Sequence, residues 1–331
     1  MKKIIIIAAV LVFSLTLFQG NPSQVMAQKK TLITIASGWV TGCYYPLGGS
    51  ISRILFQNPD LGLRATVESS GASVANSNLI ANGDADVAIL QNDIAYYAYN
   101  GQRMFAADTG NRQAKNMQAI CTLYPEYIQI QALKKSNIRT PADLKGKRVC
   151  VGPLGSGTEV NAGQILEMYG LTFDDLAKVE RLTSKESSDF MKDGRIDAAF
   201  YTVGLGAAVL ADTAFMTPCT LVNIDDQHAA NLIKKYPFYA QFPIKAGTYK
   251  DSEEVKTVAV LSMLVTRADM PEKDIYNFTK AIFENLETVH KAHAALKDVS
   301  LESAMDGMSV PLHPGAKKYF QEKGIQIPAG Y

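Results

Sequence analysis

The chain has 331 residues, of which 47% are hydrophobic, and 33 basic residues nearly balance 32 acidic ones to give a net charge of +1. This length is enough for one large or two ordinary domains with a substantial core. The near-zero net charge argues against a nucleic-acid partner and against a polybasic membrane contact.

The first residues have the pattern of an export signal. Lys2 and Lys3 precede an apolar stretch at 4–18, and Val25 to Ala27 offers a cleavage site. The stretch is shorter than the roughly 20 residues that a membrane-spanning helix needs. We predict a cleaved signal peptide over 1–27 and a periplasmic mature protein, with an uncleaved N-terminal anchor as the alternative. Cleavage after Ala27 removes two lysines and no acidic residue, which changes the net charge from +1 to −1.

Strand-like and helix-like runs then alternate along the chain, which is typical of an α/β protein with mainly parallel sheets. The expected strands, in chain order, are 33–36, 63–68, 87–90, 127–134, 148–151 and 255–266. The expected helices are 51–55, 72–81, 160–169 and one that opens at Pro271 and runs past Val289. The segment 236–251 is rich in Pro, Gly and Tyr, so we expect it to be irregular.

Two glycine-bracketed turns stand between a strand and a helix, at 42–49 and at 152–158. Turns of this kind direct unpaired backbone N–H groups and the positive end of a helix dipole towards one point. Two such turns facing each other would form a receptacle for a small anion. Simple helix capping is the alternative interpretation of each turn alone.

A weak internal repeat follows the two turns. The segment 82–90 resembles 193–201, and both copies end in a strand that we expect to be buried. We interpret this as two similar α/β lobes with a cleft between them. Ligands of open α/β sheets bind beyond the carboxyl ends of the strands. This rule puts five residues near the cleft: Gln91, Asn92, Asp93, Tyr201 and Thr202.

Catalytic and cofactor motifs are missing from the sequence. The turn at 152–158 lacks the lysine of a phosphate loop, the dinucleotide pattern fails at Val160, and no Gly-x-Ser-x-Gly elbow occurs. His290 and His293 lie three residues apart without an acidic or cysteine ligand nearby, so we interpret them as part of a solvated helix face rather than a metal site. We therefore expect no enzyme activity, no cofactor and no metal.

Four cysteines are scattered over the mature chain, at Cys43, Cys121, Cys150 and Cys219, without C-x-x-C spacing. An exported protein could pair them, and the sequence leaves any pairing open.

At these residues the chain resembles the TAXI family of solute receptors, the extracytoplasmic binding subunits of a class of TRAP transporters. The similar segments span nearly all of the mature chain in the right order: 41–46, 70–76, 82–86, 143–149, 155–160, 193–198, 258–269 and 312–316.

The resemblance implies an α/β, two-lobed fold of the periplasmic-binding-protein type (type II), with a central ligand cleft and no catalysis. We expect lobe 1 to consist of residues 28–127 plus about 260–331, and lobe 2 of residues 128–259. Lobe closure would be a hinge motion near Tyr127 and Val258.

The family is associated with small carboxylates, such as glutamate, glutamine and 2-oxo acids, which it delivers to an ion-driven TRAP permease that is often fused. We expect a monomeric receptor for such a ligand. A ligand-sensing binding protein that acts on a signalling partner is the alternative. Carried over from the family, the ligand contacts are Thr41, Gly42, Tyr44, Tyr45, Ser70, Gln91, Ser156, Gly157, Thr158 and Tyr201.

Two residues depart from the family pattern, because Trp39 and Cys43 stand where small residues or threonine are usual. We expect both to be walls of the pocket. A bulky apolar Trp39 could exclude the usual ligands or favour an apolar one.

Overall fold

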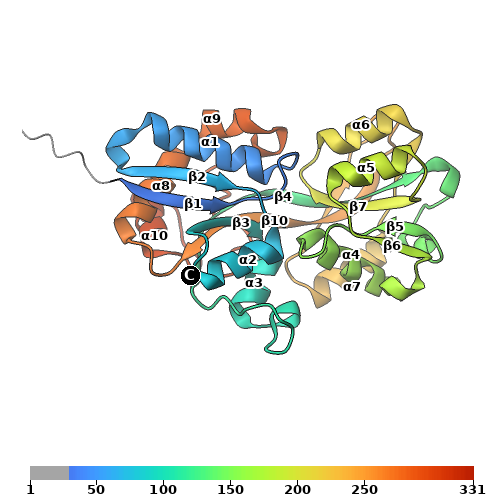
Figure 1. Ribbon diagram of the computed structural model, residues 1–331, viewed down its shortest axis with the longest axis horizontal. Helices are drawn as coiled ribbons and strands as arrows, with labels where there is room; N and C mark the ends of the chain where they lie inside the picture. Colours follow the sequence, from blue (N-terminus) through green and yellow to red (C-terminus); the bar gives the residue numbers. More distant parts are fainter. Residues whose placement is uncertain (1–29) are drawn as a thin grey trace, which may run out of the picture.

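The computed structural model describes residues 30–331, so the predicted signal peptide at 1–27 lies outside the described residues. The chain forms two α/β lobes side by side, joined by two long strands (Figure 1). The strands are β1 (Thr31–Ala36), β2 (Leu63–Glu68), β3 (Val87–Gln91), β4 (Met117–Leu133), β5 (Arg148–Cys150), β6 (Lys178–Glu180), β7 (Ala198–Val203), β8 (Cys219–Leu221), β9 (Ala240–Ile244) and β10 (Val255–Arg267). The α-helices are α1 (Tyr44–Gln57), α2 (Ser73–Asn82), α3 (Asn92–Asn100), α4 (Gly157–Met168), α5 (Ser184–Lys192), α6 (Ala208–Met216), α7 (Asp226–Lys235), α8 (Glu272–Phe283), α9 (Leu286–Ala292) and α10 (Pro314–Glu322).

The first lobe is built on strands in the order β2-β1-β3-β10. Strand β1 pairs in parallel with β2 and β3, and β10 pairs antiparallel with β3. Helices α1 and α9 lie over one face of the sheet, and α2 and α3 lie over the other (Figure 1). Strand β3 is buried along its whole length, as expected for a strand covered on both faces. The lobe has one apolar core, formed by residues between 33 and 124 and between 263 and 320.

The second lobe repeats this layered plan with strands in the order β4-β7-β5-β6. Strand β5 pairs in parallel with β6 and β7, while β4 pairs antiparallel with β7. Helices α5 and α6 lie on one side and α4 and α7 on the other (Figure 1). Two apolar clusters fill this lobe, and their members come from residues 128–260.

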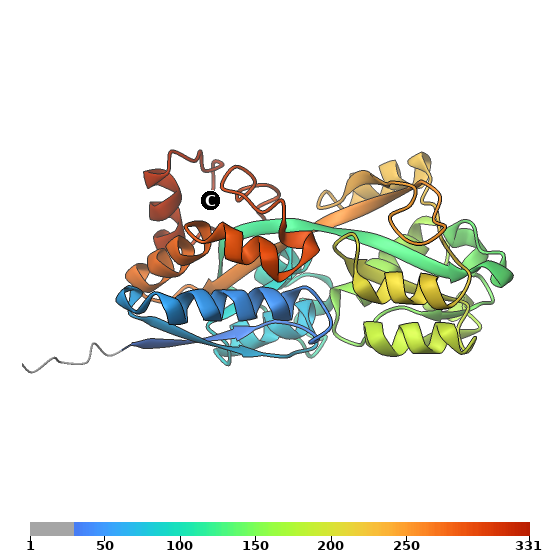
Figure 2. The same ribbon diagram turned by 90° about the horizontal axis from the view of Figure 1, so that it is seen from above.

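Strands β4 and β10 run through both lobes and pair with each other in antiparallel fashion, as Figure 2 shows from above. Strand β10 pairs with β9 through residues 255–259 and with β3 through residues 262–266. The ladder between the two long strands shifts register between Leu261 and Met263, and Leu261 is opposite Pro125. The expectation of mainly parallel pairing is therefore right for the outer strands only, since the centre of the molecule is antiparallel.

Several predicted elements have different bounds in the structure. Strand β4 begins at Met117, ten residues before the predicted start at Tyr127, and β9 lies inside the segment predicted to be irregular. The helix predicted to run from Pro271 past Val289 is two helices, because Asn285 leaves the helical conformation (φ −131°, ψ 34°) between α8 and α9.

The glycine turn predicted at 42–49 is shorter than expected, because α1 begins at Tyr44 and contains Gly48 and Gly49. A Cβ atom on Gly48 would lie 2.8 Å from Val67 Cγ1, so this glycine allows α1 to pack closely on β2.

All four cysteines are buried and free, so within residues 30–331 no pair is oxidised. In the same range, each helix is too short or too polar to cross a bilayer.

Candidate functional site

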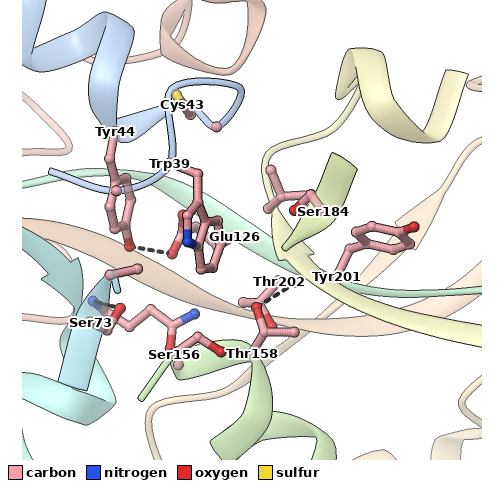
Figure 3. A pocket seen from close by; sticks show the side chains of 16 residues that line it. Trp39, Cys43, Tyr44, Ser73, Glu126, Ser156, Thr158, Ser184, Tyr201 and Thr202 are labelled. Carbon is pink, nitrogen blue, oxygen red and sulfur yellow. Dashed lines mark hydrogen bonds between the residues drawn. The ribbon is translucent and has the colours of Figure 1, made fainter. Parts of the chain in front are cut away.

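A cavity of about 50 Å³ lies between the lobes, beyond the carboxyl ends of the parallel strands (Figure 3). From the first lobe and its crossing strand come Gly38, Trp39, Gly42, Cys43, Tyr44, Ala72, Ser73, Gln91 and Glu126. From the second lobe come Ser156, Gly157, Thr158, Ser184, Tyr201, Thr202 and Val203. In Figure 3, Tyr44 and Glu126 stand on one side of the cavity, while Ser184 and Tyr201 stand on the other.

Four helices from both lobes begin at this cavity. Tyr44 opens α1, Ser73 opens α2, Gly157 opens α4 and Ser184 opens α5, and all four residues line the cavity. The unpaired N–H groups and positive dipole ends of helix N-termini favour a negative charge. Among the lining residues, all of which the structure describes, there is no lysine or arginine. An anion would therefore be held by dipoles and hydroxyl groups rather than by a full positive charge.

The second glycine turn shapes the start of α4. Gly152 and Gly155 adopt left-handed conformations with φ of 91° and 79°, which glycine alone adopts at little cost. Ser156 then caps the helix, since its Oγ accepts a hydrogen bond from Glu159 N at 3.2 Å. A Cβ atom on Gly157 would overlap the side-chain amide of Gln91, so the start of α4 touches the opposite lobe directly.

Further contacts show that the lobes are closed on the cavity. Ala75 N donates to Gly155 O at 3.3 Å, which joins the start of α2 to the second glycine turn. Asn161 on α4 donates to Asp93 Oδ2 on α3 at 3.0 Å and to the Tyr239 hydroxyl at 2.7 Å. Burial raises the pKa of Asp93 to about 6, against hydrogen bonds that lower it.

A buried carboxyl group faces the cavity from strand β4. Glu126 is only 3% exposed, and its two oxygens accept hydrogen bonds from Tyr44 Oη at 2.8 Å and Tyr124 Oη at 3.2 Å. Burial raises the pKa of Glu126 to about 8, although hydrogen bonds from Tyr44, Tyr124 and Gln91 act in the opposite direction. This carboxyl group is therefore largely protonated at neutral pH.

Two buried polar atoms of the lining have no protein partner, Gln91 Oε1 and Tyr201 Oη. Buried polar atoms are normally hydrogen-bonded, so Gln91 Oε1 is free to bind a small molecule. The Tyr201 hydroxyl points away from the cavity in Figure 3 and lies near Cys150 and Cys219 inside the second lobe.

Seven of the ten residues predicted to contact ligand line the cavity: Gly42, Tyr44, Gln91, Ser156, Gly157, Thr158 and Tyr201. So do the two predicted wall residues, Trp39 and Cys43. Their contact with a ligand remains a prediction.

The other three predicted residues do not line the cavity. Thr41 is exposed and Tyr45 is half-buried. Ser70 is used within the first lobe, where its hydroxyl donates to Asn76 Oδ1 at 2.6 Å and accepts from Ala72 N at 3.1 Å.

Several lining residues were not predicted from the sequence, mainly Glu126, Ser73 and Ser184. Ser184 follows Thr183, which forms a capping box with Glu186 and so marks a helix start that could have been recognised. Glu126 carries no such local signal, because it lies in the middle of a long strand.

The histidine pair does not form a metal site. His290 Nε2 donates to Val299 O at 2.8 Å, and His293 Nδ1 accepts from Ala295 N at 3.1 Å. Residues 30–331 contain no cluster of three His, Cys, Asp or Glu side chains that could hold a metal. His293 also lies beyond the end of α9, contrary to the prediction that both histidines share one helix face.

Comparison with solved structures identifies relatives of the fold. A protein of Bordetella bronchiseptica RB50 matches with a TM-score of 0.53 at 16% identity, over 92% of this chain and 91% of its own. A Xanthomonas citri protein bound to chloride ion matches with a TM-score of 0.50 at 11% identity, over 88% and 95% of the two chains. The periplasmic aliphatic sulphonate binding protein SsuA of Escherichia coli gives 0.48 at 15% identity, over 88% and 78%.

The two lobes, the crossing strands and the cleft at the strand ends make this the two-lobed type II fold of periplasmic solute-binding proteins. Residues 35–324, nearly the whole of the described chain, match the NMT1-like family. The chain is therefore a member of the NMT1-like family.

Proposed function

We propose that this protein is an exported receptor whose two lobes close on a small carboxylate and deliver it to a TRAP-type membrane permease, as the resemblance to the TAXI receptors implies. Residues 28–127 and about 260–331 form one lobe, and residues 128–259 form the other. The receptor acts as a periplasmic monomer after cleavage near Ala27, and it carries out no chemical reaction on its ligand.

One observation carries the proposal: helix N-termini from both lobes meet at one cavity that is lined by no basic side chain. A site of this kind favours an anion only when both lobes contribute, which couples binding to closure. The volume of about 50 Å³ would hold about four water molecules, which fits a small acid rather than a nucleotide.

The crossing strands support a hinge between the lobes. Their ladder is irregular between Leu261 and Met263, close to the predicted hinge at Tyr127 and Val258. A small change of twist in these two strands would move the lobes as rigid bodies.

The first test is thermal unfolding of the mature protein against amino acids, dicarboxylates and 2-oxo acids, with Trp39 as the fluorescent reporter. A ligand at 100 times its Kd adds about 2.7 kcal/mol to the free energy of unfolding. A shift of several degrees with one acid is the expected result. The absence of any shift, in protein first unfolded and refolded to remove bound ligand, would contradict the proposal.

The proposed contacts can be tested by removing two hydroxyl groups. The double variant Ser156→Ala with Thr158→Ala should weaken binding of that acid by about 1–3 kcal/mol, the size of one or two hydrogen bonds. Thr172→Ala is the matched control, because Thr172 forms a capping box at the short helix Phe173–Asp175 of the same lobe but does not line the cavity. Affinity equal to that of the control would rule out this part of the site.

Uptake assays test the permease. Uptake of the acid by cells should stop when the TRAP permease is deleted and should depend on an ion gradient. Uptake that instead requires ATP hydrolysis would assign the receptor to an ABC-type system, and normal uptake without either permease would favour the signalling alternative.

A further inference from the structure

Glu126 is the one carboxyl group among the residues that line the cavity, all of which belong to the described part of the chain. It is buried, and neither of its oxygens forms an ion pair with a lysine or arginine of residues 30–331. Its hydrogen bonds come from neutral donors, which are the phenols Tyr44 and Tyr124 and the side-chain amide of Gln91. The protein therefore provides hydrogen-bond donors for this carboxyl group but no counter-charge.

A buried carboxyl group without a counter-charge is costly, so its place at a ligand cavity calls for an explanation. Each carboxylate oxygen can accept more than one hydrogen bond, so both oxygens keep acceptor capacity after the two phenols have bound. Close by, Gln91 Oε1 is a second buried acceptor that has no partner. Two acceptors without a cationic partner form one side of the cavity, and the helix N-termini described above surround it.

We infer that Glu126 recognises a protonated amine, so that the ligand is a zwitterion such as an α-amino acid, with its carboxylate at the helix N-termini and its ammonium group at Glu126. Gln91 Oε1 would accept a second hydrogen bond from the same ammonium group. This inference rests on the proposed function, which it narrows: a 2-oxo acid or a dicarboxylate would lack the group that Glu126 binds.

Binding of an ammonium group at Glu126 should depend on pH. The titratable groups that face Glu126 are Tyr44 and Cys43 at the start of α1, Tyr124 on β4, and Asp93 on α3. Burial raises the pKa of Cys43 to about 12 and those of both tyrosines well above their usual range, so these groups stay neutral near pH 7. Burial also raises the pKa of Asp93 to about 6, so Asp93 is mostly ionised above that pH.

An ammonium ligand must displace the proton of Glu126, whose pKa is about 8 in the empty site. Binding should then release up to about one proton, and affinity should rise up to about tenfold per pH unit between about pH 6.5 and 8. A ligand that accepts a hydrogen bond from protonated Glu126 would show the opposite trend, with affinity falling as the pH approaches 8.

The test uses pairs of acids that differ only in the amine: L-glutamate with 2-oxoglutarate, L-alanine with pyruvate, and L-leucine with 4-methyl-2-oxopentanoate. Calorimetry gives the affinity for each acid, and two buffers of different ionisation enthalpy give the proton release. The proteins are the wild type, Glu126→Gln and Glu287→Gln, where Glu287 is an exposed residue of α9 that pairs only with Lys291.

We expect the wild type and Glu287→Gln to prefer the amino acid of one pair by at least about tenfold, the size of a charge-assisted hydrogen bond. Glu126→Gln should lose that preference and the proton release, while it keeps its affinity for the oxo acid. Should Glu126→Gln fail to fold, proton release by the wild type still decides the matter.

Each other result overturns the inference in a distinguishable way. Equal binding of both members of a pair, or tighter binding of the oxo acid, would refute recognition of an amine and leave the carboxylate receptor intact. An amino-acid preference that survives in Glu126→Gln would show that residues other than Glu126 bind the amine. If no acid of any pair binds, the proposed function fails together with the inference.

Discussion

Helices α1 and α4 both begin at the cavity, but their glycines meet different neighbours. Gly48 lies one turn inside α1 and packs against Val67 of β2, within the first lobe. Gly157 is the first residue of α4 and packs against Gln91, which belongs to the opposite lobe. The contact between Gly48 and Val67 is therefore part of the fold of one lobe. The contact between Gly157 and Gln91 exists only while the two lobes are closed.

This difference separates stability from binding. A methyl group added at α1 should change the free energy of unfolding, whereas one added at α4 should change the balance between open and closed forms. Four substitutions test this separation.

Gly157→Ala should have the largest effect, on binding. Its Cβ would overlap the buried side chain of Gln91, and overpacking of this kind costs about 1–3 kcal/mol, here in the closed form alone. We expect the affinity for the bound acid to fall about 10- to 100-fold by calorimetry, with little change in the free energy of unfolding. Gly163→Ala, in the same helix with only an ordinary contact to Phe173, is the control. Equal affinities in the two variants would show that closure does not depend on this approach.

Gly48→Ala should reduce stability and leave affinity unchanged. The added Cβ would lie 2.8 Å from Val67 Cγ1, and we expect a loss of about 1–3 kcal/mol in urea unfolding. Gly49→Ala is the matched control, because its Cβ would meet no atom within 4 Å and alanine is the better helix former. A stable Gly48→Ala variant with weakened binding would reverse the roles assigned to the two helices.

Asn161→Ala should weaken binding moderately. Asn161 lies one helical turn beyond Gly157 and bonds to Asp93 across the interface, so its loss leaves a buried carboxyl group without this donor. A hydrogen bond of this kind contributes about 0.5–1.5 kcal/mol, so we expect the Kd to rise up to about tenfold. The control is Asn223→Ala, which removes a bond to Lys256 N inside the second lobe. If both variants bind equally well, the contact between Asn161 and Asp93 does not stabilise the closed form.

Gly155→Ala should have the smallest effect on binding: affinity should be nearly unchanged, while stability falls by about 1–2 kcal/mol, because φ is 79° and no atom lies near the added Cβ. Gly155→Asn should lose less, since asparagine tolerates the left-handed conformation better. Urea unfolding of both variants measures the difference, and a larger loss for asparagine would argue against backbone strain as the cause.

The alternation of apolar and polar residues predicted most of the elements, including β2 at its observed bounds of 63–68 and β10 to within one residue. It missed the first half of β4, where Pro125 argues against a central strand. The structure accommodates Pro125 where the ladder to β10 becomes irregular, a tertiary feature that no local pattern reports.

Position along a strand explains why Gln91 and Tyr201 were found and Glu126 was missed. Gln91 and Tyr201 were found because they lie at or near the ends of strands that point into the cleft, a general property of α/β sheets. Glu126 reaches the cavity from the middle of a strand, and only the paths of β4 and β10 between the lobes bring it there. Ser70 was also expected at the site but does not line the cavity. Small polar residues in a turn serve the backbone as often as a ligand, and the Ser70 hydroxyl accepts a hydrogen bond from Ala72 N.

The position of β10 between β3 and β4 also bears on the order of folding. The second lobe comes from one continuous stretch of chain, so most of its contacts are available once residue 260 has been made. The first lobe needs contacts such as that between Thr266 Oγ1 and Asp86 O, which are 180 residues apart. Long-range pairing slows folding, so we expect the second lobe to acquire structure first and the first lobe to fold only when the last strand is inserted into its sheet.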